Sequence, residues 1–291
     1  MTRNLGHRER CIFIVAVAML CCAVSAMAAD PEPLLRAHSH NDYTRAQPLL
    51  DALELGFCSV EADIHLIDGE LLVAHDKEDV EPGKTLQSMY LDPLLERAKK
   101  HGGHIFAKKS RFILLIDIKS SATATYKKLQ EVLEGYHEML SVFTDTSTEE
   151  KAVTVLISGN RSTRRILSES PRLAAVDGRI PDLDKEVNCH AMPMISASWG
   201  SVFSWEGRGP LPPDQKQRLD ELIQKTHERG QLLRFWALPD SNMVWPTVYR
   251  SGVDIINADK IADLARYLRG AQSAKKGGAR TIRHPVRSQP K

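Results

Sequence analysis

Hydrophobic positions along this chain follow two alternating patterns. Short, nearly continuous apolar runs, such as RFILLIDIK at 111–119, are typical of buried strands. Other segments, such as DQKQRLDELIQKTHERG at 214–230, repeat apolar residues at helical spacing and end at a glycine. Since strands that alternate with helices form parallel βαβ units, the pattern predicts an α/β domain.

The count of main strands suggests how that domain closes. Eight are expected, at 34–38, 59–67, 111–119, 152–158, 173–179, 192–199, 232–238 and 253–258. A further strand at 70–75 follows a DG turn. Helices are expected at 47–56, 85–103, 125–140, 162–170, 214–230, 243–252 and 260–268. We therefore predict a single-domain (β/α)8 TIM barrel over residues 30–270. A doubly wound open sheet is the alternative, although no glycine-rich nucleotide fingerprint follows the first strand.

Both chain ends differ from this domain. Residues 1–29 have a basic start, an apolar centre and a small-residue cleavage pattern, which predict a signal peptide and an exported protein, periplasmic or secreted. A retained membrane anchor is the alternative. Residues 271–291 are basic and lack apolar periodicity, so we expect a disordered tail that could contact an anionic membrane weakly. In an exported protein, Cys58 and Cys189 could form a disulfide, but sequence cannot show that they are close enough.

Composition excludes one class of function. Hydrophobic residues make up 42% of the chain, which is ordinary for a globular protein with a sizeable core. The formal net charge is only +2, which argues against a dedicated nucleic-acid-binding protein.

Acidic residues on two of the expected strands indicate a metal site. In VEADIHLI, Glu61 and Asp63 share one face of the strand, because side chains alternate across it. Neighbouring buried carboxylates repel each other unless positive charge lies between them. With Asp117 from LLIDIK as a third oxygen ligand, the donors suit Mg²⁺ or Ca²⁺, and Lys119 could hold a negative substrate oxygen. The alternative is a structural network of ion pairs.

Histidines end two of the apolar runs, LLRAH and ELLVAH. A cation flanked by His38 and His75 suits phosphodiester chemistry, in which one histidine accepts a proton and the other donates one. Asp76, next to His75, could orient an imidazole ring.

Together, AHSHNDY, SVEADIHLIDGELLVAHD and LLIDIK resemble the phosphatidylinositol-phospholipase-C-like phosphodiesterase superfamily. This superfamily includes glycerophosphodiester phosphodiesterases and sphingomyelinase D. The HSHNDY form is most similar to the group related to the altered inheritance of mitochondria protein. The resemblance extends from His38 to about Asp259. It implies acid/base roles for His38 and His75, metal binding by Glu61, Asp63 and Asp117, and substrate contacts by Lys119, Asn41 and Trp236.

Two departures from the glycerophosphodiesterase pattern concern the substrate. That family has an arginine where this chain has Ser39, and either Arg161 or Arg179 could replace its contact with phosphate. The third acid is Asp117 rather than glutamate, which is closer to the sphingomyelinase D-like members.

The resulting hypothesis is a metal-dependent phosphodiesterase that acts on a glycerophosphodiester or a (lyso)phospholipid. Two alternatives remain at this point. The HSH motif also occurs in binuclear metal hydrolases, although the later strand ends lack the further histidines that those enzymes need. An inactive barrel could instead bind phosphorylated or sugar ligands through Trp199, Trp205 and Trp236.

Overall fold

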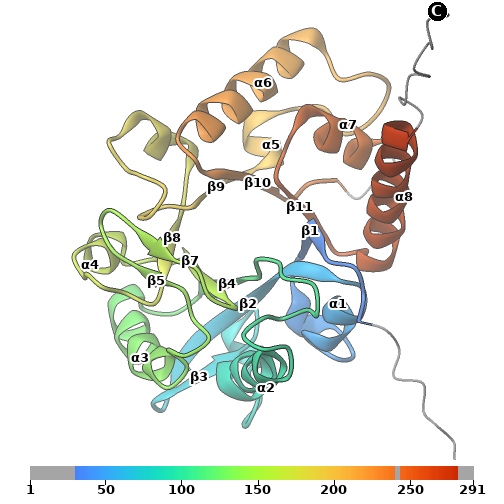
Figure 1. The fold of residues 1–291 in the computed structure, drawn as a ribbon. Helices are drawn as coiled ribbons and strands as arrows, with labels where there is room; N and C mark the ends of the chain where they lie inside the picture. The colour runs from blue at the N-terminus through green and yellow to red at the C-terminus, as the bar shows by residue number, and fades with distance from the viewer. Residues whose placement is uncertain (1–29, 240–242, 281–291) are drawn as a thin grey trace, which may run out of the picture.

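A closed ring of eight parallel strands forms the centre of the protein (Figure 1). The computed structural model describes residues 30–239 and 243–280. Around the ring the strands are β1 (Leu34–Ser39), β2 (Phe57–Ile67), β4 (Ile113–Ile118), β7 (Thr154–Gly159), β8 (Ala175–Gly178), β9 (Met194–Ser198), β10 (Leu232–Trp236) and β11 (Ile255–Ala258). Hydrogen bonding between β1 and β2 closes the ring. The predicted single-domain TIM barrel is therefore confirmed, and the open sheet is excluded.

Helices cover the outside of the ring in chain order (Figure 1). They are α1 (Leu50–Glu54), α2 (Asp92–Lys100), α3 (Ala122–Glu134), α4 (Thr163–Leu167), α5 (Trp199–Val202), α6 (Pro213–Glu228), α7 (Val244–Ser251) and α8 (Ile261–Arg280). Single turns lie at η1 (Asp42–Thr44), η2 (Lys77–Asp79) and η4 (Ile180–Asp184), and the π-helical segment η3 (Gln87–Leu91) leads into α2. In the described part of the chain, no helix is both long and apolar enough to cross a membrane.

Strand β3 (Glu70–Val73) pairs antiparallel with the end of β2 and forms a hairpin outside the ring. Asp68 and Gly69 both have positive φ, as the DG turn predicts. The long β2 thus continues past the barrel and returns through β3 to His75. This hairpin places His75 near Glu61 and Asp63, the two acids on β2.

The barrel interior changes from apolar to polar at one level. An apolar cluster that includes Leu115, Leu156 and Met194 fills the lower interior. Two residues further along the same strands come Asp117, Ser158 and Ser196, which share the inward face because side chains alternate. The outward face, with residues such as Leu114 and Ile116, packs into the larger core beneath the helices.

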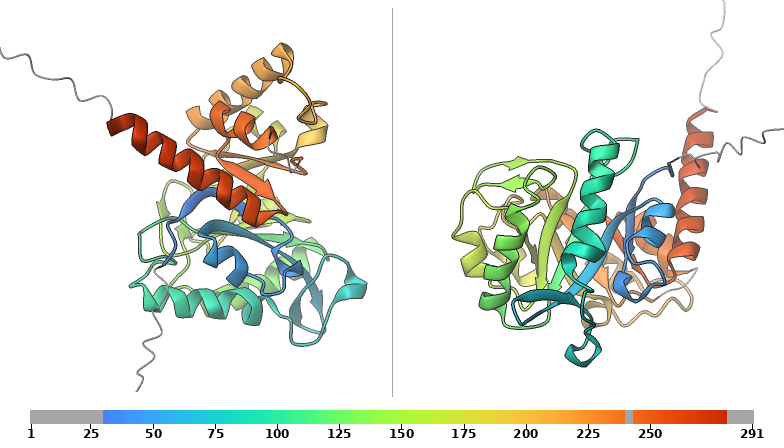
Figure 2. Two further views of the ribbon diagram at one scale, coloured as in Figure 1. Left: turned by 90° about the vertical axis from the view of Figure 1, so that its right-hand side faces the viewer. Right: turned by 90° about the horizontal axis from the view of Figure 1, so that it is seen from below.

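Some local expectations differ from the structure. A small antiparallel pair, β5 (Val142–Phe143) and β6 (Thr148–Glu149), was not predicted, since two-residue strands carry no periodicity. Helix α3 ends at Glu134, where Gly135 is the C-cap, rather than at 140. The expected disordered tail at 271–291 is corrected in part: α8 continues to Arg280, past the barrel (Figure 2), while 281–291 lie outside the described residues.

The disulfide between Cys58 and Cys189 is not formed. Both residues are free cysteines, and Cys58 is buried in the core. Burial raises the pKa of the Cys58 thiol to about 12. This thiol therefore packs as a small apolar group.

A glycine contact at the start of β2 gives a test of the fold. Gly56 has φ +75, and a Cβ there would lie 2.5 Å from the Glu32 carbonyl oxygen, whereas Gly69 has φ +84 and open space around it. Both alanine variants should lose about 1–2 kcal/mol from the positive φ. Gly56→Ala should lose roughly 1–3 kcal/mol more from overpacking. Denaturant unfolding measures the loss of stability in each variant. Equal losses in Gly56→Ala and Gly69→Ala would contradict the close contact between Gly56 and the Glu32 carbonyl oxygen.

Candidate active site

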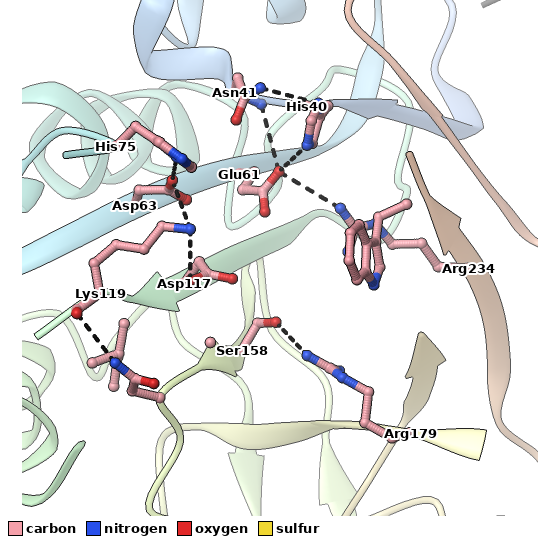
Figure 3. A pocket seen from close by; sticks show the side chains of 14 residues that line it. His40, Asn41, Glu61, Asp63, His75, Asp117, Lys119, Ser158, Arg179 and Arg234 are labelled. Carbon is pink, nitrogen blue, oxygen red and sulfur yellow. Dashed lines mark hydrogen bonds and ion pairs between the residues drawn. The ribbon is translucent and has the colours of Figure 1, made fainter. Parts of the chain in front are cut away.

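A pocket of about 420 Å³ opens at the carboxyl ends of the barrel strands (Figure 3). In TIM barrels this end carries the functional residues, because the strand ends and the following loops converge there. The pocket is lined by His40, Asn41, Glu61, Asp63, His75, Asp117, Ile118, Lys119, Ser158, Gly159, Asn160, Arg179, Arg234 and Trp236. Most of the predicted site residues are in this set, but His38 and the alternative phosphate-contacting candidate Arg161 are not.

Three carboxylates meet on one side of the pocket. Glu61, Asp63 and Asp117 each place an oxygen within 4.8 Å of the others. In register, Asp63 pairs with Asp117 across β2 and β4. Oxygens on opposite sides of one ion are about 4–5 Å apart, twice the Mg²⁺–O or Ca²⁺–O distance. Thus the donor type and the spacing of this acid cluster fit a hard divalent cation.

Charge within the acid cluster is only partly balanced. The Lys119 ammonium lies 3.1 Å from both Asp63 Oδ2 and Asp117 Oδ1. Burial and the charges of Glu61 and Asp117 raise the pKa of Asp63, despite Lys119. For Glu61, burial raises the pKa, but His38 and Arg234 outweigh it and hold that pKa below its usual range. A further positive charge would relieve the repulsion felt by Asp63.

His75 is held at the rim by one of these acids. Its Nδ1 lies 2.9 Å from Asp63 Oδ2, and the same oxygen accepts a hydrogen bond from the Tyr43 hydroxyl at 2.8 Å. The His75 side chain is 59% exposed. From β2, His65 Nε2 contacts the His75 carbonyl oxygen at 3.1 Å. The carboxylate that contacts the ring is thus Asp63, from β2, and not the suggested partner Asp76.

A second histidine at the pocket is His40. Its Nδ1 lies 2.7 Å from Asp259 Oδ1, and its Nε2 lies 3.7 Å from Glu61 Oε2. A carboxylate on Nδ1 fixes the tautomer that leaves Nε2 as the reactive nitrogen. His40 and His75 therefore flank the acid cluster, each oriented by a carboxylate.

The predicted acid/base residue His38 lies beneath the pocket and does not line it. His38 is fully buried, with Nδ1 2.7 Å from Ser59 Oγ. Its Nε2 accepts a hydrogen bond from Arg234 Nη2 at 3.1 Å. Both ring nitrogens therefore have a protein partner, and Nε2 also lies 3.8 Å from Glu61 Oε2. Of the two HSH histidines, His40 lines the pocket and His38 does not.

Two arginines line the remaining wall. Arg234 is buried, donates to Asn257 Oδ1 at 2.7 Å and lies 3.6 Å from Glu61 Oε2. Arg179 donates to Asp177 Oδ2 at 2.6 Å and to Ser158 Oγ at 3.0 Å. Sequence reasoning named Arg179 but missed Arg234, although an arginine inside the apolar run LLRFWAL was a usable signal. Arg161, the other candidate, does not line the pocket.

The HNDY sequence shapes the loop beside these groups. Asn41 has a left-handed backbone (φ 46), and its Oδ1 lies 2.9 Å from the Tyr43 hydroxyl. Asp42 is fully buried and accepts hydrogen bonds from Ser39 Oγ at 2.6 Å and the Leu49 backbone N–H at 2.5 Å. Asp42 thus fixes the loop, while Asn41 and Tyr43 reach the site. The sequence analysis missed Tyr43.

Comparison with known proteins identifies the family. Residues 27–174, more than half of the chain, match the family model of the AIM6-like phosphodiesterase domain. The chain belongs to the AIM6-like phosphodiesterase domain family. The match includes the acid cluster, Lys119, His40 and His75, but ends before Arg179 and Arg234. This family membership confirms the resemblance inferred from the sequence.

Relatives of this AIM6-like chain are fungal. Altered inheritance of mitochondria protein 6 from Eremothecium gossypii is 29% identical over 281 residues, covering 84% of this chain and 72% of the relative. A homolog from Arthroderma benhamiae is 26% identical, covering 77% and 81%. Among solved structures, a putative glycerophosphoryl diester phosphodiesterase from Agrobacterium tumefaciens is 14% identical with a TM-score of 0.48, covering 83% of this chain and 99% of the other.

Predicted export is contradicted by these comparisons. The relatives are named altered inheritance of mitochondria proteins, a name that does not fit a periplasmic or secreted protein. Residues 1–29, from which a signal peptide was inferred, lie outside the described residues.

Neither alternative interpretation gains support from the geometry. Within residues 30–239 and 243–280, the acid cluster is the one group of three or more His, Cys, Asp or Glu side chains that meets metal-site spacing, and neither HSH histidine belongs to it. Trp199 and Trp205 are buried in the core and do not line the pocket. Trp236 alone of the three proposed stacking residues is at the pocket, where it is 41% exposed.

The buried His38 predicts a pH-dependent stability. Burial, helped by Arg234, lowers the pKa of His38 to about 3, whereas an unfolded histidine titrates near 6.5. Between these values the unfolded chain binds the extra proton, so stability is lost as pH falls below about 6.5, by up to about 1.4 kcal/mol per pH unit. The unmodified protein should therefore lose its advantage in free energy of unfolding over His38→Gln as the pH falls from 6.5 to 5. Denaturant unfolding of both proteins at several pH values measures this difference. A constant difference would contradict a buried neutral His38.

Proposed function

We propose that this protein is a metal-dependent phosphodiesterase that uses His40 and His75 as its acid/base pair. The observation that carries the proposal is the acid cluster flanked by two carboxylate-oriented histidines in one pocket. Family membership supports a phosphodiesterase-like barrel. Sequence alone suggested His38 for the role that we now give to His40, because only His40 faces the pocket.

Glu61, Asp63 and Asp117 would hold Mg²⁺ or Ca²⁺, which when bound supplies positive charge that polarises a phosphoryl oxygen. Asp63 has a double role in this proposal. Its Oδ2 already orients His75 and accepts a hydrogen bond from Tyr43. A change at Asp63 therefore affects both the ligand set and a histidine.

Proton transfer is assigned to the two imidazoles. One takes the proton of the attacking hydroxyl or water, and the other gives a proton to the leaving oxygen. Asp259 and Asp63 each accept from Nδ1, so both rings direct Nε2 toward the reaction. The carboxylate partners also stabilise whichever ring becomes positively charged.

Phosphate binding is assigned to Lys119 and Arg234. Both cations lie beside the acid cluster, Lys119 at Asp63 and Asp117 and Arg234 at Glu61. Arg234 comes from β10 and would take the place of the arginine that the glycerophosphodiesterase pattern has at Ser39. Together they would stabilise the negative charge on the non-bridging phosphoryl oxygens.

The substrate class follows from the pocket. We propose a glycerophosphodiester or a (lyso)phospholipid, with Asn41 and Trp236 contacting the part next to the phosphate. The exposed face of Trp236 offers an apolar surface at the rim.

Loss of either pocket histidine should abolish turnover. We expect His40→Ala and His75→Ala each to lower kcat on bis(4-nitrophenyl) phosphate and on glycerophosphodiesters at least about 100-fold. His137→Ala removes an exposed histidine away from the pocket and should have no effect. Chelation with EDTA should stop the reaction of the unmodified protein, and Mg²⁺ or Ca²⁺ should restore it. Full activity of His40→Ala, or activity that resists chelation, would disprove the proposal.

Metal affinity should depend on Gly159. Gly159 has φ +65, and a Cβ there would overlap the Asp117 carboxylate. Gly159→Ala should therefore displace Asp117 and weaken Mg²⁺ or Ca²⁺ binding, measured by calorimetry, at least about tenfold. Gly83→Ala is the matched control, since Gly83 has φ +83 with no atom near its Cβ position. Equal affinities in the two variants would argue against Asp117 as a ligand.

A further inference from the structure

Arg179, which lines the pocket, is held in place by several hydrogen bonds to the protein. It follows β8, and its Nη1 donates to Asp177 Oδ2 at 2.6 Å and lies 3.0 and 2.9 Å from the carbonyl oxygens of Asp177 and Gly178. Its Nη2 donates to Ser158 Oγ at 3.0 Å. These contacts fix the guanidinium plane before any ligand arrives.

The anchor itself is hidden from the pocket. Asp177 is fully buried, and its two oxygens accept hydrogen bonds from Ser158 and Ser196 at 3.0 and 2.6 Å. Asp177 does not line the pocket, whereas Arg179 does and is 28% exposed. A ligand therefore meets the cation and not its partner anion.

Part of the guanidinium remains available. Among the described residues, no hydrogen bond uses Arg179 Nε, while Nη1 and Nη2 are directed to Asp177 and Ser158. The Nε side of an arginine can donate in parallel with Nη2 to a carboxylate or phosphate. The anchoring thus leaves a donor edge suited to an oxyanion.

Arg179 also lies apart from the groups assigned to the scissile phosphate. Asp117 on β4 pairs in register with Ser158 on β7, and Arg179, from the next strand β8, reaches back to Ser158. Figure 3 shows Lys119 and Asp117 on one side of Ser158 and Arg179 on the other. No hydrogen bond or ion pair joins Arg179 to the acid cluster in the described structure.

We propose that Arg179 is a second anion subsite, which recognises a carboxylate or phosphomonoester on the alcohol part of the phosphodiester. The preferred substrates then carry one negative group beyond the scissile phosphate. This inference rests on the proposed function, because it places the scissile phosphate at the acid cluster.

Matched substrate pairs test the subsite. Glycerophosphoserine differs from glycerophosphoethanolamine by one carboxylate, and glycerophosphoinositol 4-phosphate differs from glycerophosphoinositol by one phosphomonoester. Arg179→Gln should lower kcat/KM about 10- to 100-fold on the more anionic member of a pair, the usual effect of losing a charged hydrogen bond. On the less anionic member, Arg179→Gln should change kcat/KM by less than about twofold.

Two further variants separate the subsite from charge and folding effects. Arg161 is a nearby cation that does not line the pocket: burial and the charge of Arg179 lower the pKa of Arg161. Arg161→Gln should change kcat/KM by the same factor for both members of each pair. Because Arg179→Gln leaves Asp177 buried without its cation, the double variant Arg179→Gln/Asp177→Asn removes both charges and should show the same selective loss.

Binding distinguishes failure of the subsite from failure of the proposed function. In His40→Ala, calorimetry should show tighter binding of the more anionic member of at least one pair, and adding Arg179→Gln should remove that preference. Equal binding and equal kcat/KM within both pairs would overturn the subsite while leaving the phosphodiesterase proposal intact. The opposite result is tighter binding of the more anionic compounds by a protein that hydrolyses none of them. That result would support the subsite and disprove the proposed phosphodiesterase function.

Discussion

Repulsion among three carboxylates at the mouth of the barrel is the constraint to which the rest of the site responds. Glu61, Asp63 and Asp117 bring their oxygens within 4.8 Å of one another at the edge of a largely apolar interior. Such a cluster is costly to bury unless cations compensate it. Lys119 lies beside Asp63 and Asp117, and Arg234 lies beside Glu61, while burial and the neighbouring carboxylates still raise the pKa of Asp63. Binding of a divalent cation would complete the compensation.

The barrel produces this convergence through register. On six of the strands the inward position changes from apolar to polar just after the apolar cluster, at Asp117, Ser158, Asp177, Ser196, Arg234 and Asn257. Parallel strands with short register steps bring residues that are far apart in sequence to adjacent positions. The apolar layer below holds the strands rigid, which keeps the charged layer in place.

In the HSHNDY segment, neighbouring residues have opposite tasks. His38, Ser39 and Asp42 are buried and make hydrogen bonds within the protein. His40 and Asn41, between Ser39 and Asp42, and Tyr43, directly after Asp42, contact the pocket groups. The left-handed backbone at Asn41 turns the chain so that these side chains point to different places. A motif of this kind carries both structural and chemical information in neighbouring residues.

Sequence by itself determined the βαβ pattern, the strand that carries Glu61 and Asp63, the third acid Asp117 and the hairpin that returns to His75. These follow from periods of apolar residues and from the alternation of side chains along a strand, which are local properties. Only the tertiary structure decided that His40 rather than His38 faces the pocket, because the Ser59 and Arg234 partners that occupy His38 come from other strands. The same holds for Arg234 and for the Asp177 anchor of Arg179: their roles depend on which side chains meet across the closed ring, and no local pattern records that.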